Sequence, residues 1–120
     1  MIADFYRILG KSCHGTHATY DILLPTACEV YKGHFPNEPV VPGVCSIQML
    51  HELAEDCIAD KLNITGIKQC RFIGLLCPSD DNILHVDIDF TDLSTIPVTM
   101  RAVVRSDNSV FIKLCAELSL

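Results

Sequence analysis

One segment of this chain has the periodicity of a helix, and it lies between regions with the periodicity of strands. From Val44 to about Leu62, apolar residues recur at helical spacing while acidic residues occupy the opposite side. The spacing predicts one helix of about five turns, ending near Asn63, a residue type that suits a helix C-terminus. The apolar positions are Ile47, Leu50, Ala54, Cys57, Ile58 and Leu62, and the acidic ones are Glu52, Glu55, Asp56 and Asp60. The fold must bury one face of a single long helix.

The rest of the chain alternates apolar and polar residues with period two, which is typical of half-buried antiparallel strands. These stretches are Cys13 to about Val30 before the helix, and after it a strand ending near Leu76 followed by 86–90, 98–104 and 112–118. Turn residues separate the later stretches at 78–82 and 106–109. We therefore expect residues 1–120 to form a single α+β domain, with a four-stranded antiparallel meander after the helix.

A loop rich in glycine and proline joins the first strands to the helix. It reads Gly33-His34-Phe35-Pro36-Asn37-Glu38-Pro39-Val40-Val41-Pro42-Gly43-Val44, and its three prolines exclude a continuous helix. It matches every fixed position of the pattern G-H-F-P-x-x-P-x-x-P-G-V. On these residues the chain resembles the single-domain 3-hydroxyacyl-[acyl carrier protein] dehydratases, from about Ala18 to the C-terminus. The resemblance implies a hotdog fold, in which an antiparallel sheet wraps around one long central helix, and a dimer whose two sheets join.

The resemblance also implies how the loop works. Dehydration of a 3-hydroxyacyl thioester needs a base for the C2 proton, and His34 is implied as that base. Gly43 begins the helix, where unpaired backbone N–H groups can polarise the thioester carbonyl. The implied substrate-binding residues are Phe35, Pro42, Val44 and Cys45, and no cofactor or metal is implied. The helix N-terminus could also lower the pKa of the Cys45 thiol.

One position departs from the family pattern. The carboxylate that works with the histidine should stand five residues after Gly43, where this chain has Gln48. An amide cannot deliver a proton, and loss of a general acid typically costs about 10²–10⁴ in rate. Glu52 lies one helical turn further along and is the alternative acid. Against that role, one turn displaces it by about 5–6 Å, and a solvated helix carboxylate is the simpler interpretation.

Three functions remain open on this sequence. The first is a hydro-lyase, a dehydratase of fatty-acid or related acyl-chain synthesis. The second is a subunit that binds acyl thioesters without catalysis of its own, or pairs with a hotdog paralogue that supplies the missing carboxylate. The third is a hotdog thioesterase, in which Gln48 would position the substrate.

Charge and cysteine content limit the partners. The net charge of −6 argues against nucleic acid, which is bound through clustered Lys and Arg. The expected partner is an acyl carrier protein or a coenzyme A thioester, and an acidic carrier would need a basic patch. Its candidate residues are Lys32, Lys68, Arg71, Arg101 and Arg105. Seven cysteines without any C-x-x-C spacing favour reduced thiols, and no apolar stretch approaches the length of a membrane span, so we expect a cytoplasmic protein.

Overall fold

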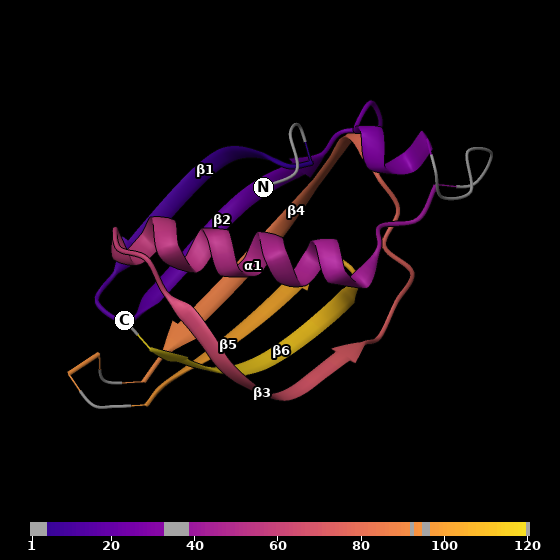
Figure 1. The fold of residues 1–120 in the computed structure, drawn as a ribbon. Coiled ribbons are helices and arrows are strands. Elements are labelled where there is room, and N and C mark those ends of the chain that lie inside the picture. The colour runs from indigo at the N-terminus through magenta and orange to yellow at the C-terminus, as the bar shows by residue number, and fades with distance from the viewer. Residues whose placement is uncertain (1–4, 33–38, 92, 95–96, 120) are drawn as a thin grey trace.

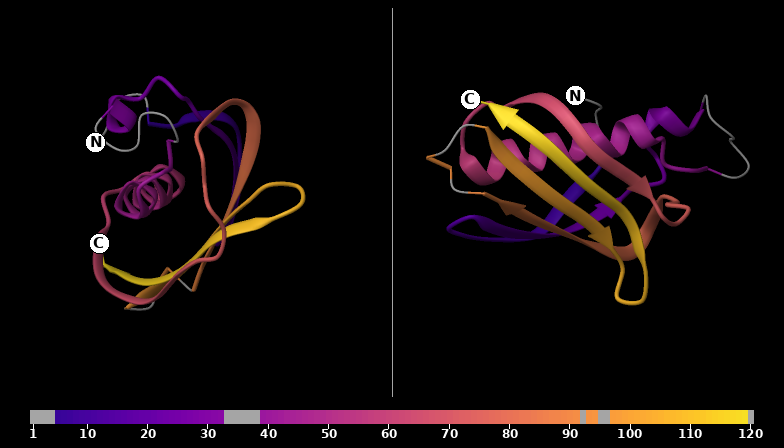
Figure 2. Two further views of the ribbon diagram at one scale, coloured as in Figure 1. Left: turned by 90° about the vertical axis from the view of Figure 1, so that its right-hand side faces the viewer. Right: turned by 90° about the horizontal axis from the view of Figure 1, so that it is seen from below.

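A computed structural model describes residues 5–32, 39–91, 93–94 and 97–119, which form one helix, one short 3-10 helix and one antiparallel sheet. The sheet order is β1-β2-β4-β5-β6-β3, and it curves around α1 (Figure 1 and, seen along the helix, Figure 2). In chain order the elements are β1 (Arg7–His14), β2 (His17–Leu24), η1 (Glu29–Lys32), α1 (Gly43–Ile58), β3 (Asn63–Phe72), β4 (Ser79–Phe90), β5 (Val98–Arg105) and β6 (Val110–Ser119).

Strand alternation places one set of side chains against the helix. In β2 every second residue from Ala18 is buried, and the alternating stretches of β4, β5 and β6 behave in the same way. The sequence prediction for 86–90, 98–104 and 112–118 is therefore confirmed. The polar alternates lie on the outer surface of the sheet, where Arg105 Nε donates to Asp87 Oδ2 at 2.7 Å and His17 contacts Asp89 at 2.6 Å.

The helix contributes its apolar face to the same core. Met49, Leu50, Leu53 and Ala54 are almost completely buried because the sheet curves over them. Tyr20, reaching in from β2, donates its hydroxyl proton towards the backbone oxygen of Leu53 at 3.2 Å and Asp56 Oδ2 at 2.8 Å. The core thus fixes the rotation of α1 about its axis, and with it the side that faces outward.

Replacing Leu50 with alanine should lower the free energy of unfolding by about 2–5 kcal/mol, because the truncation leaves a cavity in a core that cannot collapse fully. Leu50 has no exposed surface. Urea denaturation measures the change. The control is Ile83→Ala in β4, where the side chain is half exposed and the expected loss is within about 0.5 kcal/mol. Equal losses at the two sites would contradict the assigned core.

The helix ends earlier than the apolar spacing predicts. It stops at Ile58, because Ala59 has a left-handed backbone (φ 62°) and its N–H closes on Glu55 O at 2.8 Å. Leu62 is buried outside the helix, and its backbone groups are held by helix side chains: its N–H donates to Glu55 Oε2 at 2.9 Å, and its oxygen lies 2.5 Å from His51 Nε2. The predicted end at Asn63 is wrong, since Asn63 begins β3.

Two strand predictions also need correction. The first strand-like stretch is the second half of a hairpin, whose turn at Gly15 has a positive φ of 59°; β1, which starts at Arg7, was not foreseen. The strand after the helix does not continue the meander. Instead, β3 pairs with β6, and the meander consists of β4, β5 and β6. This crossing puts β3 at one edge of the sheet, in front of the others in Figure 1.

Candidate active site

Within the described residues, the first turn of α1 has backbone donors without a hydrogen-bond acceptor. Pro42 precedes the helix in an extended conformation (φ −64°, ψ 138°) and provides no side-chain cap. Its backbone oxygen accepts from the N–H groups of Cys45 (3.1 Å) and Ser46 (3.2 Å). The N–H groups of Gly43 and Val44 come before the first intrahelical acceptor, and they lie at the positive end of the helix dipole. As the sequence predicts, Gly43 starts the helix, and an oxygen carrying developing negative charge could be stabilised there.

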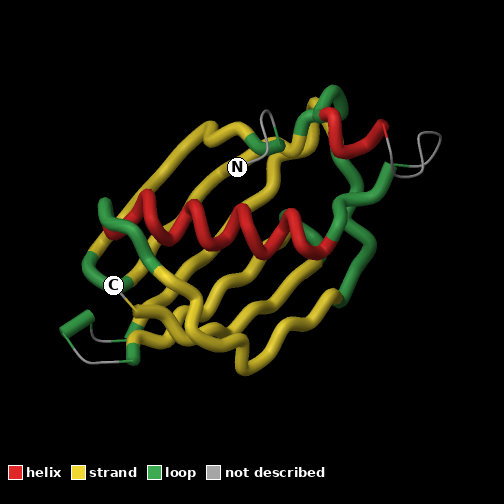
Figure 3. Tube along the Cα trace, viewed as in Figure 1, coloured by secondary structure: helices red, strands yellow, loops and turns green. Residues whose placement is uncertain are grey.

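The segment that leads into this turn is held by the loop after β3. The N–H of Val41 donates to Leu76 O at 2.8 Å, so that 39–42 and 73–78 run side by side near the start of α1 (Figure 3). Phe72, the last residue of β3, packs on Gly43: a Cβ at position 43 would lie 2.8 Å from Phe72 Cζ. A larger residue at position 43 would therefore force the Phe72 ring to shift, and glycine permits the close approach seen here.

An apolar groove of about 320 Å³ opens beside this turn. It runs between the entry segment, the first turn of α1 and the loop after β3. Its lining residues are Val40, Val41, Gly43, Ser46, Phe72, Gly74, Leu75, Leu76 and Ile112. A groove with an apolar lining next to unpaired N–H groups suits a ligand with a hydrocarbon chain and a polarisable oxygen.

The other motif residues differ in how far they are exposed to solvent. Val44 is 75% exposed on the first turn and Pro42 is half-buried beside it. Cys45 is buried, and burial, with the nearby Cys28 thiol, raises the pKa of Cys45. The expectation of a lowered pKa at this cysteine is therefore wrong, because burial outweighs the helix dipole. His34 and Phe35 lie outside the described residues.

Gln48 and Glu52 meet on the outward side of α1. Gln48 Nε2 donates to Glu52 Oε2 at 2.9 Å, as expected for side chains one turn apart. The second carboxylate oxygen, Oε1, accepts from the hydroxyl of Tyr6 at 3.0 Å. Both oxygens of Glu52 therefore receive a hydrogen bond within the chain.

Tyr6 is the site residue that the sequence does not reveal. It precedes β1, and its neighbour Phe5 is buried against it in an edge-to-face contact with ring centroids 6.4 Å apart. Burial, and then the hydrogen bond to Glu52, raise the pKa of Tyr6. Phe5 and Tyr6 close over a small hollow against α1, lined also by Cys45, Gln48, Met49 and Glu52. No spacing rule connects positions 6 and 52, so only the fold brings them together.

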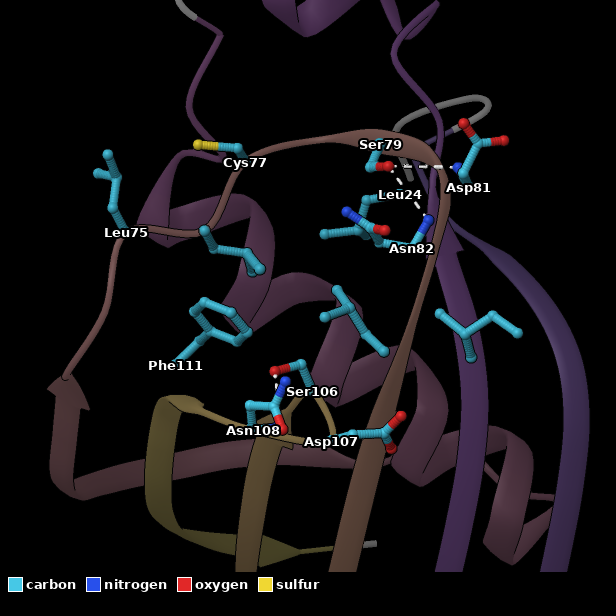
Figure 4. A pocket seen from close by; sticks show the side chains of 13 residues that line it. Leu24, Leu75, Cys77, Ser79, Asp81, Asn82, Ser106, Asp107, Asn108 and Phe111 are labelled. Atoms are coloured by element: carbon cyan, nitrogen blue, oxygen red, sulfur yellow. Dashed lines mark hydrogen bonds between the residues drawn. The ribbon is translucent and has the colours of Figure 1, made fainter.

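A larger cavity of about 590 Å³ lies elsewhere, between the turn before β4 and the turn between β5 and β6 (Figure 4). Three of its polar side chains, Ser79, Ser106 and Asp107, are engaged in hydrogen bonds within the chain. Ser79 Oγ accepts from the N–H groups of Asp81 (3.2 Å) and Asn82 (3.1 Å), and Asp107 Oδ1 lies 3.0 Å from His85 Nε2. Neither Gly43 nor Val44 lines it, so we place the candidate site at the start of α1.

Two further features of the described residues bear on function. They contain no group of three or more His, Cys, Asp or Glu side chains that could hold a metal ion. Within the same residues, the one α-helix falls short of the length and hydrophobicity that crossing a membrane requires.

Comparison with known sequences gives the family. Residues 11–108 match the family model described as ApeI-like, ApeI dehydratase. Among curated proteins, the 3-hydroxyacyl-[acyl-carrier-protein] dehydratase FabZ of Caldanaerobacter subterraneus is 36% identical over 66 residues, covering 49% of this chain and 47% of the relative. FabZ of Clostridium botulinum is 31% identical over 87 residues, covering 67% of this chain and 59% of the relative. The chain thus spans about half of the length of the curated relatives that it matches.

Comparison with solved structures confirms the hotdog fold. The dehydratase heterocomplex ApeI:P from Xenorhabdus doucetiae contains a chain with a TM-score of 0.77 and 20% identity, covering 95% of this chain and 97% of that one. A homologue of HP0420 from Helicobacter felis has a TM-score of 0.70 at 13% identity, covering 98% and 88%. The six-stranded sheet around one helix is therefore a hotdog, and the chain belongs to the ApeI-like dehydratase family.

Proposed function

We propose that this chain is a subunit of a dehydratase that binds 3-hydroxyacyl thioesters at the start of α1, in fatty-acid or related acyl-chain synthesis. The observation that carries the proposal is the first turn of α1, where the Gly43 and Val44 N–H groups have no acceptor among the described residues and lie beside an apolar groove. A thioester carbonyl would accept from these donors, and the acyl chain would lie along the groove. The partial charge of the helix N-terminus would then stabilise the enolate-like transition state.

The chemistry needs two proton transfers. His34, nine residues before Gly43 in the matched motif, would remove the C2 proton, which prepares loss of the hydroxyl from C3 as water. The departing hydroxyl must gain a proton from an acid. Gln48 carries no such proton, and both oxygens of Glu52 already accept hydrogen bonds from Tyr6 and Gln48. The proton donor would therefore be a residue other than Gln48 and Glu52.

A second hotdog subunit would supply this acid. Strand β3 is an edge of the sheet, and apolar side chains that are about half exposed or more gather along it and the loop that follows. They are Ile67 (48%), Phe72 (54%), Ile73 (50%) and Leu75 (70%). The similar chain from Xenorhabdus doucetiae is part of the dehydratase heterocomplex ApeI:P. An edge-to-edge pairing through β3 would bury this surface and bring a partner carboxylate to the groove.

The thioester would arrive on an acyl carrier protein or on coenzyme A. Of the basic candidates, Lys32, Lys68 and Arg105 are already paired with carboxylates. Arg71, at the end of β3, lies opposite Lys113 of β6, and within the described residues neither makes an ion pair. These two cations stand one residue from Phe72 and thus near the groove, where an acidic carrier could dock.

A second candidate function is acyl-thioester binding without catalysis. The observation that favours it is the hydrogen bond between Gln48 and Glu52. The family position carries an amide in this chain, and the carboxylate one turn away is already bonded to that amide. Such a subunit would retain a thioester tightly and leave turnover to its partner.

The test is an assay of purified chain, alone and mixed with a hotdog paralogue that carries glutamate at the position of Gln48. The substrate is a 3-hydroxyacyl pantetheine thioester, and absorbance of the conjugated enoyl product reports turnover. We expect slow turnover alone and an increase of about 10²–10⁴ with the paralogue. Release of free thiol without enoyl product would identify a thioesterase instead. Retention of the thioester without product in both samples would leave the binding function.

A further inference from the structure

Two thiols meet where β1 lies against the last turn of α1. Cys13 is near the end of β1 and Cys57 is next to the last residue of the helix, and both are free and half-buried. The thiol of Cys57 hydrogen-bonds to the thiol of Cys13. Because the two residues belong to different elements, only the fold brings these sulfurs together.

Other contacts hold β1 along the helix on the same side. Lys11 Nζ donates to Asp56 Oδ2 at 2.9 Å, and the hydroxyl of Tyr6, just before β1, donates to Glu52 Oε1 at 3.0 Å. Positions 6, 11 and 13 thus meet positions 52, 56 and 57 in the same order along the two elements. The thiol pair is therefore one of three contacts that join β1 to α1, and the other two keep the sulfurs within reach of each other.

The hydroxyl of Tyr20 orders the protons of the pair. It lies 2.8 Å from Asp56 Oδ2, and a carboxylate only accepts, so the single Tyr20 proton is used there. The Tyr20 oxygen can then accept from Cys13 Sγ, 3.9 Å away. Because the proton of Cys13 is directed at Tyr20, the Cys13 sulfur accepts from the S–H of Cys57. Burial, and then this hydrogen bond, raise the pKa of Cys57 and keep it a thiol, so Cys13 is the better nucleophile of the two.

We propose that Cys13 and Cys57 form a disulfide when the protein meets a hydroperoxide, which makes the pair a redox-sensitive modification site. The Cys13 sulfur attacks one peroxide oxygen, the O–O bond breaks, and the departing hydroxide takes the Cys13 proton and leaves as water. The Cys57 sulfur then attacks the sulfur of this sulfenic acid. The S–O bond breaks as the S–S bond forms, and the second hydroxide takes the Cys57 proton. The two sulfurs together lose two electrons, and the peroxide is reduced to water.

The disulfide would need little movement of the backbone. Its sulfurs must be about 2.05 Å apart, and side chains that already touch through their thiols can reach this distance by rotation about χ1. The bond would close a loop from residue 13 to residue 57, which includes the G-H-F-P segment of the sequence. Because closing so long a loop restricts the unfolded chain, the oxidised protein should be the more stable form. This modification does not depend on the proposed function.

The experiment treats the reduced chain with one equivalent of hydrogen peroxide and maps the products by non-reducing peptide mass spectrometry. We expect a cross-linked peptide that joins Cys13 to Cys57, and a melting temperature about 10 °C higher that dithiothreitol reverses. In Cys57→Ser the reaction should stop at a Cys13 sulfenic acid, which dimedone traps, and Cys13→Ser should form no cross-link at Cys57. The matched control is Cys70→Ser, another half-buried thiol, which should leave the Cys13–Cys57 bond unaltered.

Three results would overturn the proposal. The first is that Cys13 and Cys57 both stay open to alkylation while the exposed Cys77 is oxidised, because exposure alone would then govern the reaction. The second is a set of cross-links among several cysteines at similar rates. The third is dimedone labelling of Cys57 in Cys13→Ser as fast as that of Cys13 in Cys57→Ser, which would contradict the assigned nucleophile. Mapping of the unaltered chain decides the pairing even where a variant fails to fold.

Discussion

Replacing Gln48 with glutamate should raise the rate of dehydration by the chain alone by about 10²–10⁴, the usual contribution of a general acid. The reason lies in the neighbour. Gln48 Nε2 is 2.9 Å from Glu52 Oε2, so the new carboxyl group would stand against an existing carboxylate. Two carboxylates at such a distance repel each other, so the pair retains a proton to a higher pH than either group would alone. A carboxylic acid able to donate near neutral pH would then stand at the family position.

The pH dependence of this variant has a definite sign. In the folded Gln48→Glu chain the pair holds its shared proton with a raised pKa, whereas in the unfolded chain the two groups titrate normally. The variant should therefore match the parent chain in stability at low pH and become less stable as pH rises through the raised pKa. Its gain in rate should decline over the same range, as the acid loses its proton.

The measurement is the formation of enoyl product from 3-hydroxyacyl pantetheine, followed with pH. The matched control is Asn108→Asp, the same replacement of an amide by a carboxylate in the exposed turn between β5 and β6, which should leave the rate unaltered. A folded Gln48→Glu chain with no gain in dehydration would show that the site lacks more than an acid.

Local patterns in the sequence determined much of this fold. The apolar spacing from Val44 onward predicted the helix, and the period-two alternation predicted β4, β5 and β6 within a few residues. Gly43 was expected at the helix start and lies there. Pro42 disfavours a helical conformation in the residue before it, so the helix does not extend further towards the N-terminus, and glycine allows the close approach of Phe72.

The features that the sequence did not reveal depend on contacts between distant residues. The pairing of β3 with β6 joins strands that are far apart in the sequence, and no alternation pattern encodes a partner strand. The early end of α1 depends on His51 and Glu55 binding the backbone of Leu62. Tyr6 reaches Glu52 only because β1 packs beside β2, which itself lies against α1. These contacts form only in the assembled core, so local sequence patterns do not predict them.

The role of Glu52 also depends on contacts that the sequence does not reveal. From the sequence, it was either an acid displaced by one turn or a solvated carboxylate. Its geometry fits a third role: it accepts hydrogen bonds at both oxygens and orients Gln48. An acid displaced along the helix would need a free, protonated oxygen directed at the substrate, and both oxygens of Glu52 are occupied within the chain.

Replacing His34 with alanine should lower dehydration by about 10²–10⁴, because the C2 proton then has no positioned base. The sharper form of this test uses the Gln48→Glu background. A base and an acid that act in one elimination are coupled, so His34→Ala should cancel most of the gain from Gln48→Glu and not add to it independently. Imidazole added to the solution should restore part of the rate to the His34→Ala chains, since a free base can occupy the vacated space.

The control for His34 is His14→Ala, at an exposed position at the end of β1, which should have no effect on turnover. The KM for the thioester separates the two possible roles of His34. If His34 removes the proton, kcat falls while KM changes little, because the thioester is held by the first turn of α1 and the groove. A rise in KM at constant kcat, without rescue by imidazole, would make His34 a binding residue and would require the base to be sought in the partner subunit.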